Sequence, residues 1–172
     1  SDAFADLRDK QQWEILPKNF TMFAVKYINE FHGSYLHYGK NKVKDLTGNV
    51  IEENFYSEQF VEKNPVVKLV TTGRYQVSMN SFFNSQKIMG QFSILLDFNG
   101  KSCTISAPKG ATYEVTGTGD FLEKKFRWGN KDRDGIEIRY TVKQGDLTYE
   151  ANDVLVIRDR GVVMELFSPI LY

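Results

Sequence analysis

From Phe20 onward, short apolar runs alternate with clusters of turn residues at regular intervals. The runs are rich in β-branched and aromatic residues, which is typical of all-β sandwiches and barrels. The predicted strands are 21–29, 34–39, 50–56, 66–72, 75–80, 91–98, 102–107, 113–117, 136–143, 148–157 and 162–167.

Alternation within these runs indicates which faces of the strands are buried. In the predicted strand 136–143, apolar residues alternate with charged and polar ones, as expected for a strand with one face toward a core. The run 154–157 is apolar at every position, which predicts a strand covered on both sides. Asn99-Gly100 lies between two apolar runs and predicts a hairpin with a type I′ turn.

The spacing of the strands favours one antiparallel domain. The intervals are too short for repeated helical crossovers, so neighbouring strands should run antiparallel. Because closure removes exposed sheet edges, we expect a meander of about 8–11 strands that closes into a lipocalin-like β-barrel. Residues 1–19 are predicted to form a short N-terminal helical or irregular segment, and residues 20–172 the β-barrel domain.

Charge and composition exclude several classes of protein. The chain has 22 Lys and Arg against 22 Asp and Glu, so its formal net charge is zero, which argues against a nucleic-acid ligand. It contains no run of about 18 apolar residues, so no transmembrane segment is predicted. Aromatic residues make up 14% of the chain, which agrees with β structure. Cys103, the one cysteine, is predicted to be a small buried apolar side chain.

An aromatic pair between two predicted strands is the first candidate for a binding site. Phe82 and Phe83 are flanked by amide and hydroxyl side chains, including Asn84, in a stretch with few charges. Aromatic rings stack on the C–H faces of sugars while amides bind sugar hydroxyls, so this mixture favours a carbohydrate ligand. In the alternative, both rings plug the barrel mouth or pack on the neighbouring strand.

Four more side chains complete the predicted ligand-binding set. Trp128 and Tyr38 are amphipathic aromatic candidates, with core packing as the alternative. Arg158 and Arg160 end the most apolar strand, where two guanidinium groups could hold a carboxylate, a phosphate or sugar hydroxyls. In the alternative, an arginine pairs with a nearby aspartate and caps the barrel end.

We predict no catalytic residues, no metal and no cofactor. The stretch 130–135 has the oxygen spacing that opens a calcium loop, but Thr141 stands where a bidentate glutamate is required. His37 has only His32 as a nearby histidine. No acidic residue stands alone in a clearly apolar setting, so paired-carboxylate glycosidase chemistry is not expected. The protein is therefore predicted not to be an enzyme.

Three segments, 29–40 (NEFHGSYLHYGK), 128–134 (WGNKDRD) and 152–161 (NDVLVIRDRG), carry a family resemblance. Together they resemble the C-terminal domain of uncharacterised Bacteroidetes surface lipoproteins encoded beside glycan-uptake loci of the starch-utilisation type. The resemblance implies an exported, non-enzymatic protein at the outer-membrane surface, held by a lipid anchor outside the printed sequence. It implies polysaccharide or oligosaccharide as ligand and other glycan-uptake surface proteins as partners.

A weaker similarity connects the chain with lipocalin-like (calycin) barrels. It rests on Gly33-Ser34-Tyr35 early in the chain and on an arginine late in it. Three hypotheses follow. The first is a cell-surface module that binds a glycan on exposed aromatic and amide side chains. The second is a lipocalin-like carrier of a small apolar ligand, inside a cavity with a lining such as Phe23, Tyr75, Phe92 and Ile138. The third is a purely structural domain of a surface assembly.

Overall fold

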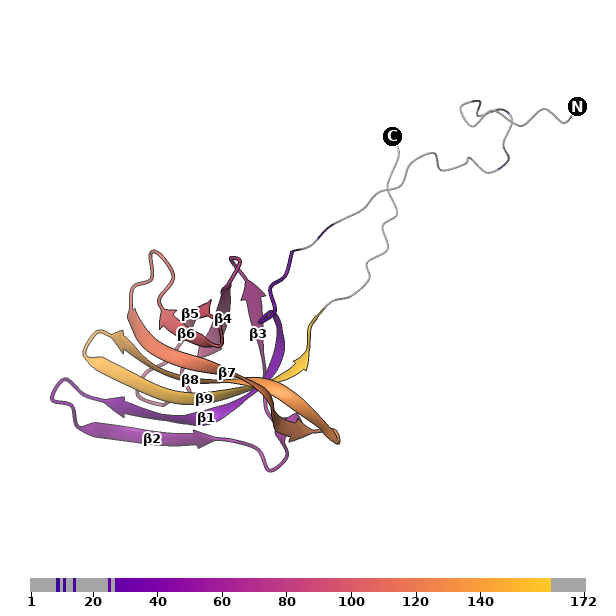
Figure 1. The fold of residues 1–172 in the computed structure, drawn as a ribbon. Coiled ribbons are helices and arrows are strands. Elements are labelled where there is room, and N and C mark those ends of the chain that lie inside the picture. The colour runs from indigo at the N-terminus through magenta and orange to yellow at the C-terminus, as the bar shows by residue number, and fades with distance from the viewer. Residues whose placement is uncertain (1–8, 10, 12–13, 15–24, 26, 162–172) are drawn as a thin grey trace, which may run out of the picture.

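Strands make up nearly all the regular structure in the part of the chain that the computed structural model describes, residues 9, 11, 14, 25 and 27–161 (Figure 1). The strands are β1 (Gly33–Lys44), β2 (Val50–Tyr56), β3 (Val66–Thr71), β4 (Gln76–Phe82), β5 (Gln91–Asn99), β6 (Ser102–Ser106), β7 (Glu114–Trp128), β8 (Lys131–Gln144) and β9 (Leu147–Asp159). A 3-10 turn, η2 (Val61–Lys63), connects β2 to β3.

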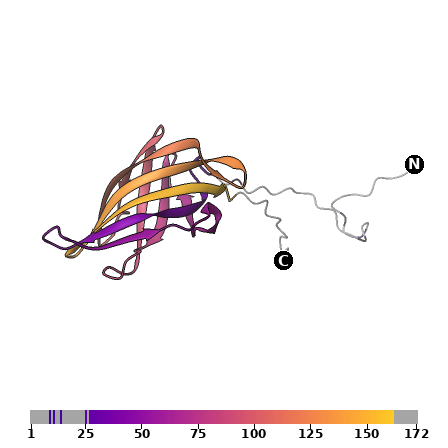
Figure 2. The same ribbon diagram turned by 90° about the horizontal axis from the view of Figure 1, so that it is seen from below.

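Eight of these strands close into an antiparallel barrel. Each strand from β3 to β8 pairs with its successor, β3 pairs with β1, and β9 pairs back along β1. The β1–β9 ladder runs from Ser34 opposite Asp159 to Lys44 opposite Thr148. Figure 2 shows the strands wrapped around one axis. Closure of the barrel provides hydrogen-bond partners for backbone groups that an edge strand would leave exposed. The predicted all-β antiparallel meander is confirmed.

The ninth strand, β2, leaves a split in the barrel wall. One edge of β1 pairs first with β3, at residues 33–36, and then with β2, at residues 39–44. The ladder between β3 and β4 ends at Leu69 opposite Met79, although β4 continues to Phe82. The barrel wall therefore has an opening between the end of β2, the start of β3 and the last residues of β4, which do not pair with β3.

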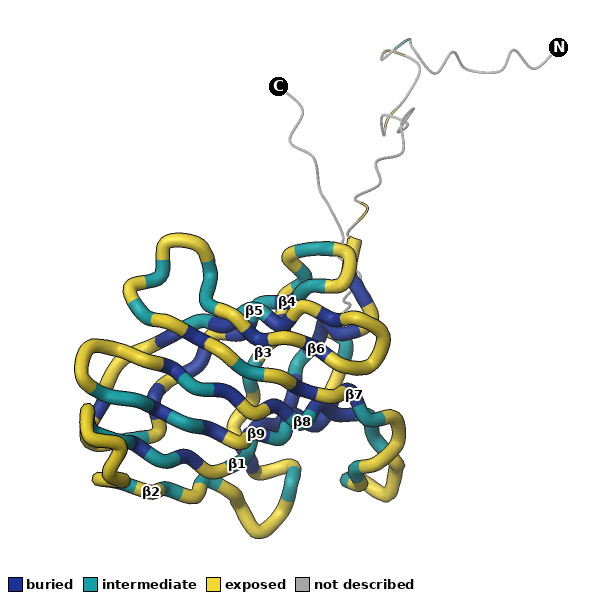
Figure 3. The backbone as a smooth tube through the Cα atoms, turned by 60° about the vertical axis from the view of Figure 1, so that its left-hand side comes forward, coloured by how far each residue is buried: buried dark blue, intermediate teal, exposed yellow. Residues whose placement is uncertain are grey.

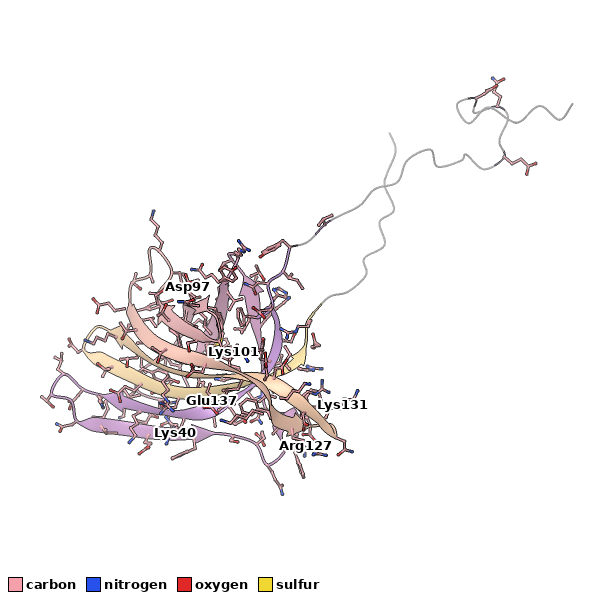
Figure 4. All side chains as sticks on the ribbon, viewed as in Figure 1. Lys40, Asp97, Lys101, Arg127, Lys131 and Glu137 are labelled. Carbon is pink, nitrogen blue, oxygen red and sulfur yellow. The ribbon has the colours of Figure 1, made fainter. Side chains whose placement is uncertain are left out.

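Alternating side chains fill the barrel interior. On β5, Phe92, Ile94, Leu96 and Phe98 face inward and are buried, while the residues between them are more exposed (Figure 3). The Phe98 ring stacks on Phe31 with ring centroids 3.6 Å apart. The charged residues labelled in Figure 4 project from the outside of the barrel. This arrangement is expected for a strand whose side chains alternate between a buried face and a solvent-exposed face.

Most predicted strands are confirmed, although β1, β7 and β8 are longer than predicted. The predicted strand 113–117 is in fact β7, which continues to Trp128. The sequence does not show this continuation because Gly117 and Gly119 interrupt the alternation of side chains. A Cβ on Gly117 would lie 2.6 Å from the Tyr140 side chain, and one on Gly119 would lie 2.7 Å from the Ile138 side chain, both on β8. The predicted strand 162–167 and most of 21–29 lie outside the described residues, as do nearly all of residues 1–19.

The hairpin predicted at Asn99-Gly100 forms, but its turn type was predicted wrongly. Asn99 pairs with Ser102, so the central residues are Gly100 and Lys101. Only Gly100 has a positive φ, of 64°, whereas a type I′ turn needs positive φ at both central residues. Positive φ at the first central residue alone is the pattern of a type II′ turn.

Two further predictions are confirmed by burial. Cys103 is 4% exposed, and its burial raises the pKa of the thiol to about 12. Val156 is 0% exposed although it lies on the outer face of β9, so part of the run 154–157 is covered on both sides, as predicted. The calcium-like stretch 130–135 lies mostly in β8, paired with β7 and β9, and does not form a loop.

Candidate functional site

The split in the barrel wall forms a groove of about 410 Å³ between β2, β3 and β4. We call it the wall groove. Its lining combines apolar side chains with amides, hydroxyls and one lysine: His37, Tyr56, Pro65, Val66, Val67, Lys68, Val70, Ser78, Asn80, Ser81, Phe82 and Asn84. The volume is within the range of small-molecule sites, and a few polar groups among apolar ones is the usual composition of such sites.

A buried polar group lies directly behind the floor of the groove. We call it the Asp153 cluster; it consists of Asp153, His37, Tyr56 and Tyr140. The Asp153 side chain is 0% exposed. Its Oδ1 accepts a hydrogen bond from the Tyr56 hydroxyl and its Oδ2 one of 2.8 Å from the Tyr140 hydroxyl. His37 Nε2 lies 2.9 Å from Oδ2, although without the alignment of a hydrogen bond.

The strand register brings these groups together. Asp153 lies opposite Gly39 across the β1–β9 ladder, and Tyr56 lies opposite Gly39 on the other side. A Cβ at Gly39 would come within 2.5 Å of the Asp153 carboxylate, so only glycine leaves room for Tyr56 to reach it. A buried carboxylate is costly unless it is paired. The two tyrosine hydroxyls, which each donate a hydrogen bond to the carboxylate, meet that requirement here.

The cluster also changes the acidity of the tyrosines around it. Burial first, and then the negative charge of Asp153, raises the pKa values of Tyr56 and Tyr140 well above the ordinary range. The same two causes raise the pKa of Tyr149 to about 12. These phenols therefore remain protonated hydrogen-bond donors at all physiological pH values.

The loop 83–90, between β4 and β5, forms one rim of the groove and is held against β2. Glu52 accepts hydrogen bonds from the Ser85 hydroxyl and from the backbone N–H groups of Gln86 and Lys87. These bonds, that of Ser85 above all, lower the pKa of Glu52 to about 2. The Asn84 carbonyl accepts bonds from two further asparagine side chains, Asn41 at 2.8 Å and Asn54 at 2.9 Å. The position of Asn84 beside the groove is thus fixed from β1 and β2.

Comparison with known proteins places these features in a family. The family model described as "Domain of unknown function (DUF5627)" matches residues 30–161, a range that contains all nine strands. The chain belongs to the DUF5627 family. A crystal structure of a protein of unknown function from Bacteroides ovatus is similar to it, with a TM-score of 0.78 and 31% sequence identity.

That similarity covers 91% of the present chain and 51% of the Bacteroides ovatus chain, so this DUF5627 chain spans about half the length of the protein it matches. No curated protein matches it. The wall groove and the Asp153 cluster lie within the residues that the DUF5627 model covers.

Of the predicted binding residues in this DUF5627 domain, the wall groove brings Phe82 and Asn84 together. Phe82 is 63% exposed on the outer face of β4. Phe83, its neighbour, points the other way: it is 7% exposed and packs against Phe92 and Tyr149, with ring centroids 4.6 and 5.1 Å apart. Phe83 is therefore a core residue, and its prediction as a ligand-binding side chain was wrong.

The two other aromatic candidates lie away from the groove. Trp128 is half-buried at the end of β7, where its Nε1 donates a hydrogen bond of 3.2 Å to the Ile157 carbonyl and its ring lies 4.2 Å from the Arg133 guanidinium carbon. Tyr38 lies half-buried on the outer face of β1, opposite the face that carries His37. The packing alternative describes Trp128 better than the binding one.

The two arginines have structural partners. Arg160 donates hydrogen bonds to the carbonyls of Glu30 and His32, and its Nη2 lies 3.9 Å from Asp134 Oδ2. Arg158 lies 3.9 Å from Asp159 and has a side chain 54% exposed. This is the capping arrangement of the alternative prediction, and neither arginine lines the wall groove.

The residues predicted to line a carrier cavity do not come together. Phe92 and Ile138 are buried in the barrel core, whereas Tyr75 is 51% exposed. Phe23 lies outside the described residues.

Sequence reasoning considered His37 only as a metal ligand and did not identify Tyr56 or Asp153 as site residues. The missed signal was alternation: Tyr149, Ala151, Asp153 and Leu155 occupy every second position of β9, which places Asp153 on the inner face.

Proposed function

We propose that the wall groove of this DUF5627 domain binds a carbohydrate chain without altering it chemically. One observation carries the proposal: Phe82 presents a ring that is 63% exposed at an opening whose lining combines apolar side chains with amides and hydroxyls. An apolar ring face beside hydrogen-bonding groups matches a sugar, which has an apolar C–H face and polar edges. Because the groove lies on the outside of the barrel wall, a polymer could pass along it.

Binding without catalysis is the better match to the groove chemistry. Glycoside hydrolysis ordinarily requires two carboxyl groups flanking the scissile bond. Among the twelve described residues that line the groove there is no Asp or Glu. Asp153, behind the floor, already accepts two hydrogen bonds and has no exposed surface.

A matched pair of substitutions tests the proposal. Phe82→Ala removes the ring from the groove, and Phe55→Ala removes an equally exposed ring, 74% exposed on β2, that does not line it. Purified proteins are compared by affinity electrophoresis against a panel of polysaccharides. We expect Phe82→Ala to weaken binding about tenfold, since covering part of a phenylalanine contributes about 1.4 kcal/mol.

The Phe55→Ala variant should bind as the wild-type protein does. Equal binding by all three proteins would contradict the assignment of the groove, and no retardation by any polysaccharide would contradict the function itself.

We further propose that the protein is exported and held at the outer-membrane surface by a lipid anchor, together with other glycan-uptake proteins, as the family resemblance implies. The physical argument is that a polysaccharide too large to cross a membrane must be bound outside it. Among the described residues, no helix has the length and hydrophobicity to cross a bilayer. Protease treatment of intact cells should degrade a surface-exposed protein, whereas full protection would contradict this location.

A further inference from the structure

The wall groove carries positive charge without a compensating carboxylate. Lys68 is the only one of its lining residues that is charged at every physiological pH. Three other surface hollows of the described residues each have a glutamate in their lining. In one of these, Lys44 Nζ lies 2.6 Å from Glu150 Oε1. Among these four hollows, the wall groove is the one whose lining holds a cation and no carboxylate.

Lys68 is exposed and makes no ion pair with any described carboxylate. Lys68 and Asn80 both line the groove, each one residue beyond the last pair of the β3–β4 ladder, Leu69 opposite Met79. The Ser93 hydroxyl donates a hydrogen bond of 2.7 Å to Asn80 Oδ1. This bond fixes the orientation of the amide and turns its Nδ2 hydrogens toward another acceptor.

The two donors lie at a suitable spacing from the exposed ring. Asn80 and Phe82 are two residues apart on the same face of β4, which corresponds to about 7 Å of strand. A single pyranose ring with an exocyclic carboxylate covers such a span. A ring stacked on Phe82 would therefore present its carboxylate toward Lys68 and Asn80, whose ammonium and amide groups are both hydrogen-bond donors for carboxylate oxygens.

Neither of the acidic side chains near the groove belongs to its lining: Glu52 accepts hydrogen bonds from the loop 83–90, and Asp153 lies behind the floor. Asp153 has no exposed surface, and the hydroxyl hydrogens of Tyr56 and Tyr140 point at its oxygens. The charge that a ligand meets at the groove surface is that of Lys68.

We propose that the wall groove selects a glycan whose sugars carry carboxylate groups, that is, a uronic-acid polymer. The carboxylate is received by Lys68 and Asn80 while the sugar ring stacks on Phe82. This inference rests on the proposed function and names its ligand class.

The experiment compares chemically matched polymers. Polygalacturonate and alginate are each tested beside their carboxyl-reduced forms, which keep the linkage and lose the charge. Dextran sulfate is tested beside dextran to show whether any anionic glycan is sufficient for binding. The proteins are the wild type, Lys68→Gln and the control Lys109→Gln, which removes the same charge from an exposed position outside the groove. Affinity electrophoresis gives the dissociation constants.

We expect one uronate polymer to bind more tightly than its reduced form, with an affinity that falls as salt is raised. Lys68→Gln should weaken uronate binding roughly fivefold, the size expected for one exposed ion pair. It should leave binding of the reduced form unchanged, and Lys109→Gln should have no effect.

Equal binding of uronate and reduced polymers, or binding of neutral glycans alone, would overturn the inference and leave the proposed function standing. Equal binding of dextran sulfate would overturn the selection of carboxylate, as would a Lys68→Gln variant with unchanged affinity. If no polymer binds in this panel or in the polysaccharide panel, both the inference and the proposed function are refuted.

Discussion

Truncating two adjacent phenylalanines to alanine should have very different effects on stability. Phe83 is 7% exposed and makes ring contacts with Phe92 and Tyr149 in the barrel core. Deleting such a ring removes its buried apolar area and leaves a cavity, at a cost of about 3–5 kcal/mol in the free energy of unfolding. Phe82 is 63% exposed, so most of its surface is already in water, and its loss should cost less than about 1 kcal/mol.

Equilibrium unfolding in urea measures both values, with the slope of the transition as a check that the unfolded states are comparable. For a domain of this size, Phe83→Ala should lower the melting temperature by roughly 8–16 °C. The reasoning is refuted if the two variants are equally stable, or if Phe82→Ala is the less stable one. The comparison also decides whether the binding data on Phe82→Ala come from a folded protein.

Two further predictions concern carboxylates. Asp153→Asn should lower the free energy of unfolding by about 2 kcal/mol, because the hydrogen bonds from Tyr56 and Tyr140 lose a charged acceptor. Urea unfolding measures this loss, with Asp97→Asn as an exposed control. A loss of less than about 0.5 kcal/mol would contradict the prediction. Glu52, with its pKa lowered to about 2, should stabilise the fold fully above its unfolded pKa of about 4.3 and progressively less as the pH falls toward 2. The stability difference between the wild type and Glu52→Gln should therefore shrink over that range, and a constant difference would disprove the assignment.

The strands of the barrel could largely be predicted from the sequence because most of them bury a single face. The alternation is complete in β5 and over residues 136–143 of β8, and the predicted ends at 98 and 143 are each one residue short, although β8 begins five residues before the predicted start. The far half of β7 could not be predicted, because Gly117 and Gly119 are required by side chains of β8 that lie about 20 residues away in the sequence. Turn type failed for a similar reason, since register decides which residues occupy the centre of the hairpin.

The candidate site could be predicted only in part. Phe82 and Asn84 were recognisable because an aromatic pair and an amide stand in a stretch of few charges. The Asp153 cluster was not, because it joins β1, β2, β8 and β9, and no local pattern shows which strands become neighbours. The wall groove has the same origin. It exists because β2 and β3 share one edge of β1, which is a property of the pairing and not of any single strand.

The closing ladder between β1 and β9 has a consequence for mechanical strength. Ser34, near the start of β1, lies opposite Asp159, at the end of β9, so tension applied through the two strand ends acts on the same end of the ladder. Hydrogen bonds loaded in this way break one pair after another. They resist much less force than the hydrogen bonds between two strands that are pulled lengthwise past each other, because those bonds are all loaded at once. The peeling front would pass His37 opposite Leu155 and then Gly39 opposite Asp153. Stretching the domain by its ends would thus separate His37 from Asp153 while the ladders from β3 to β8 were still intact.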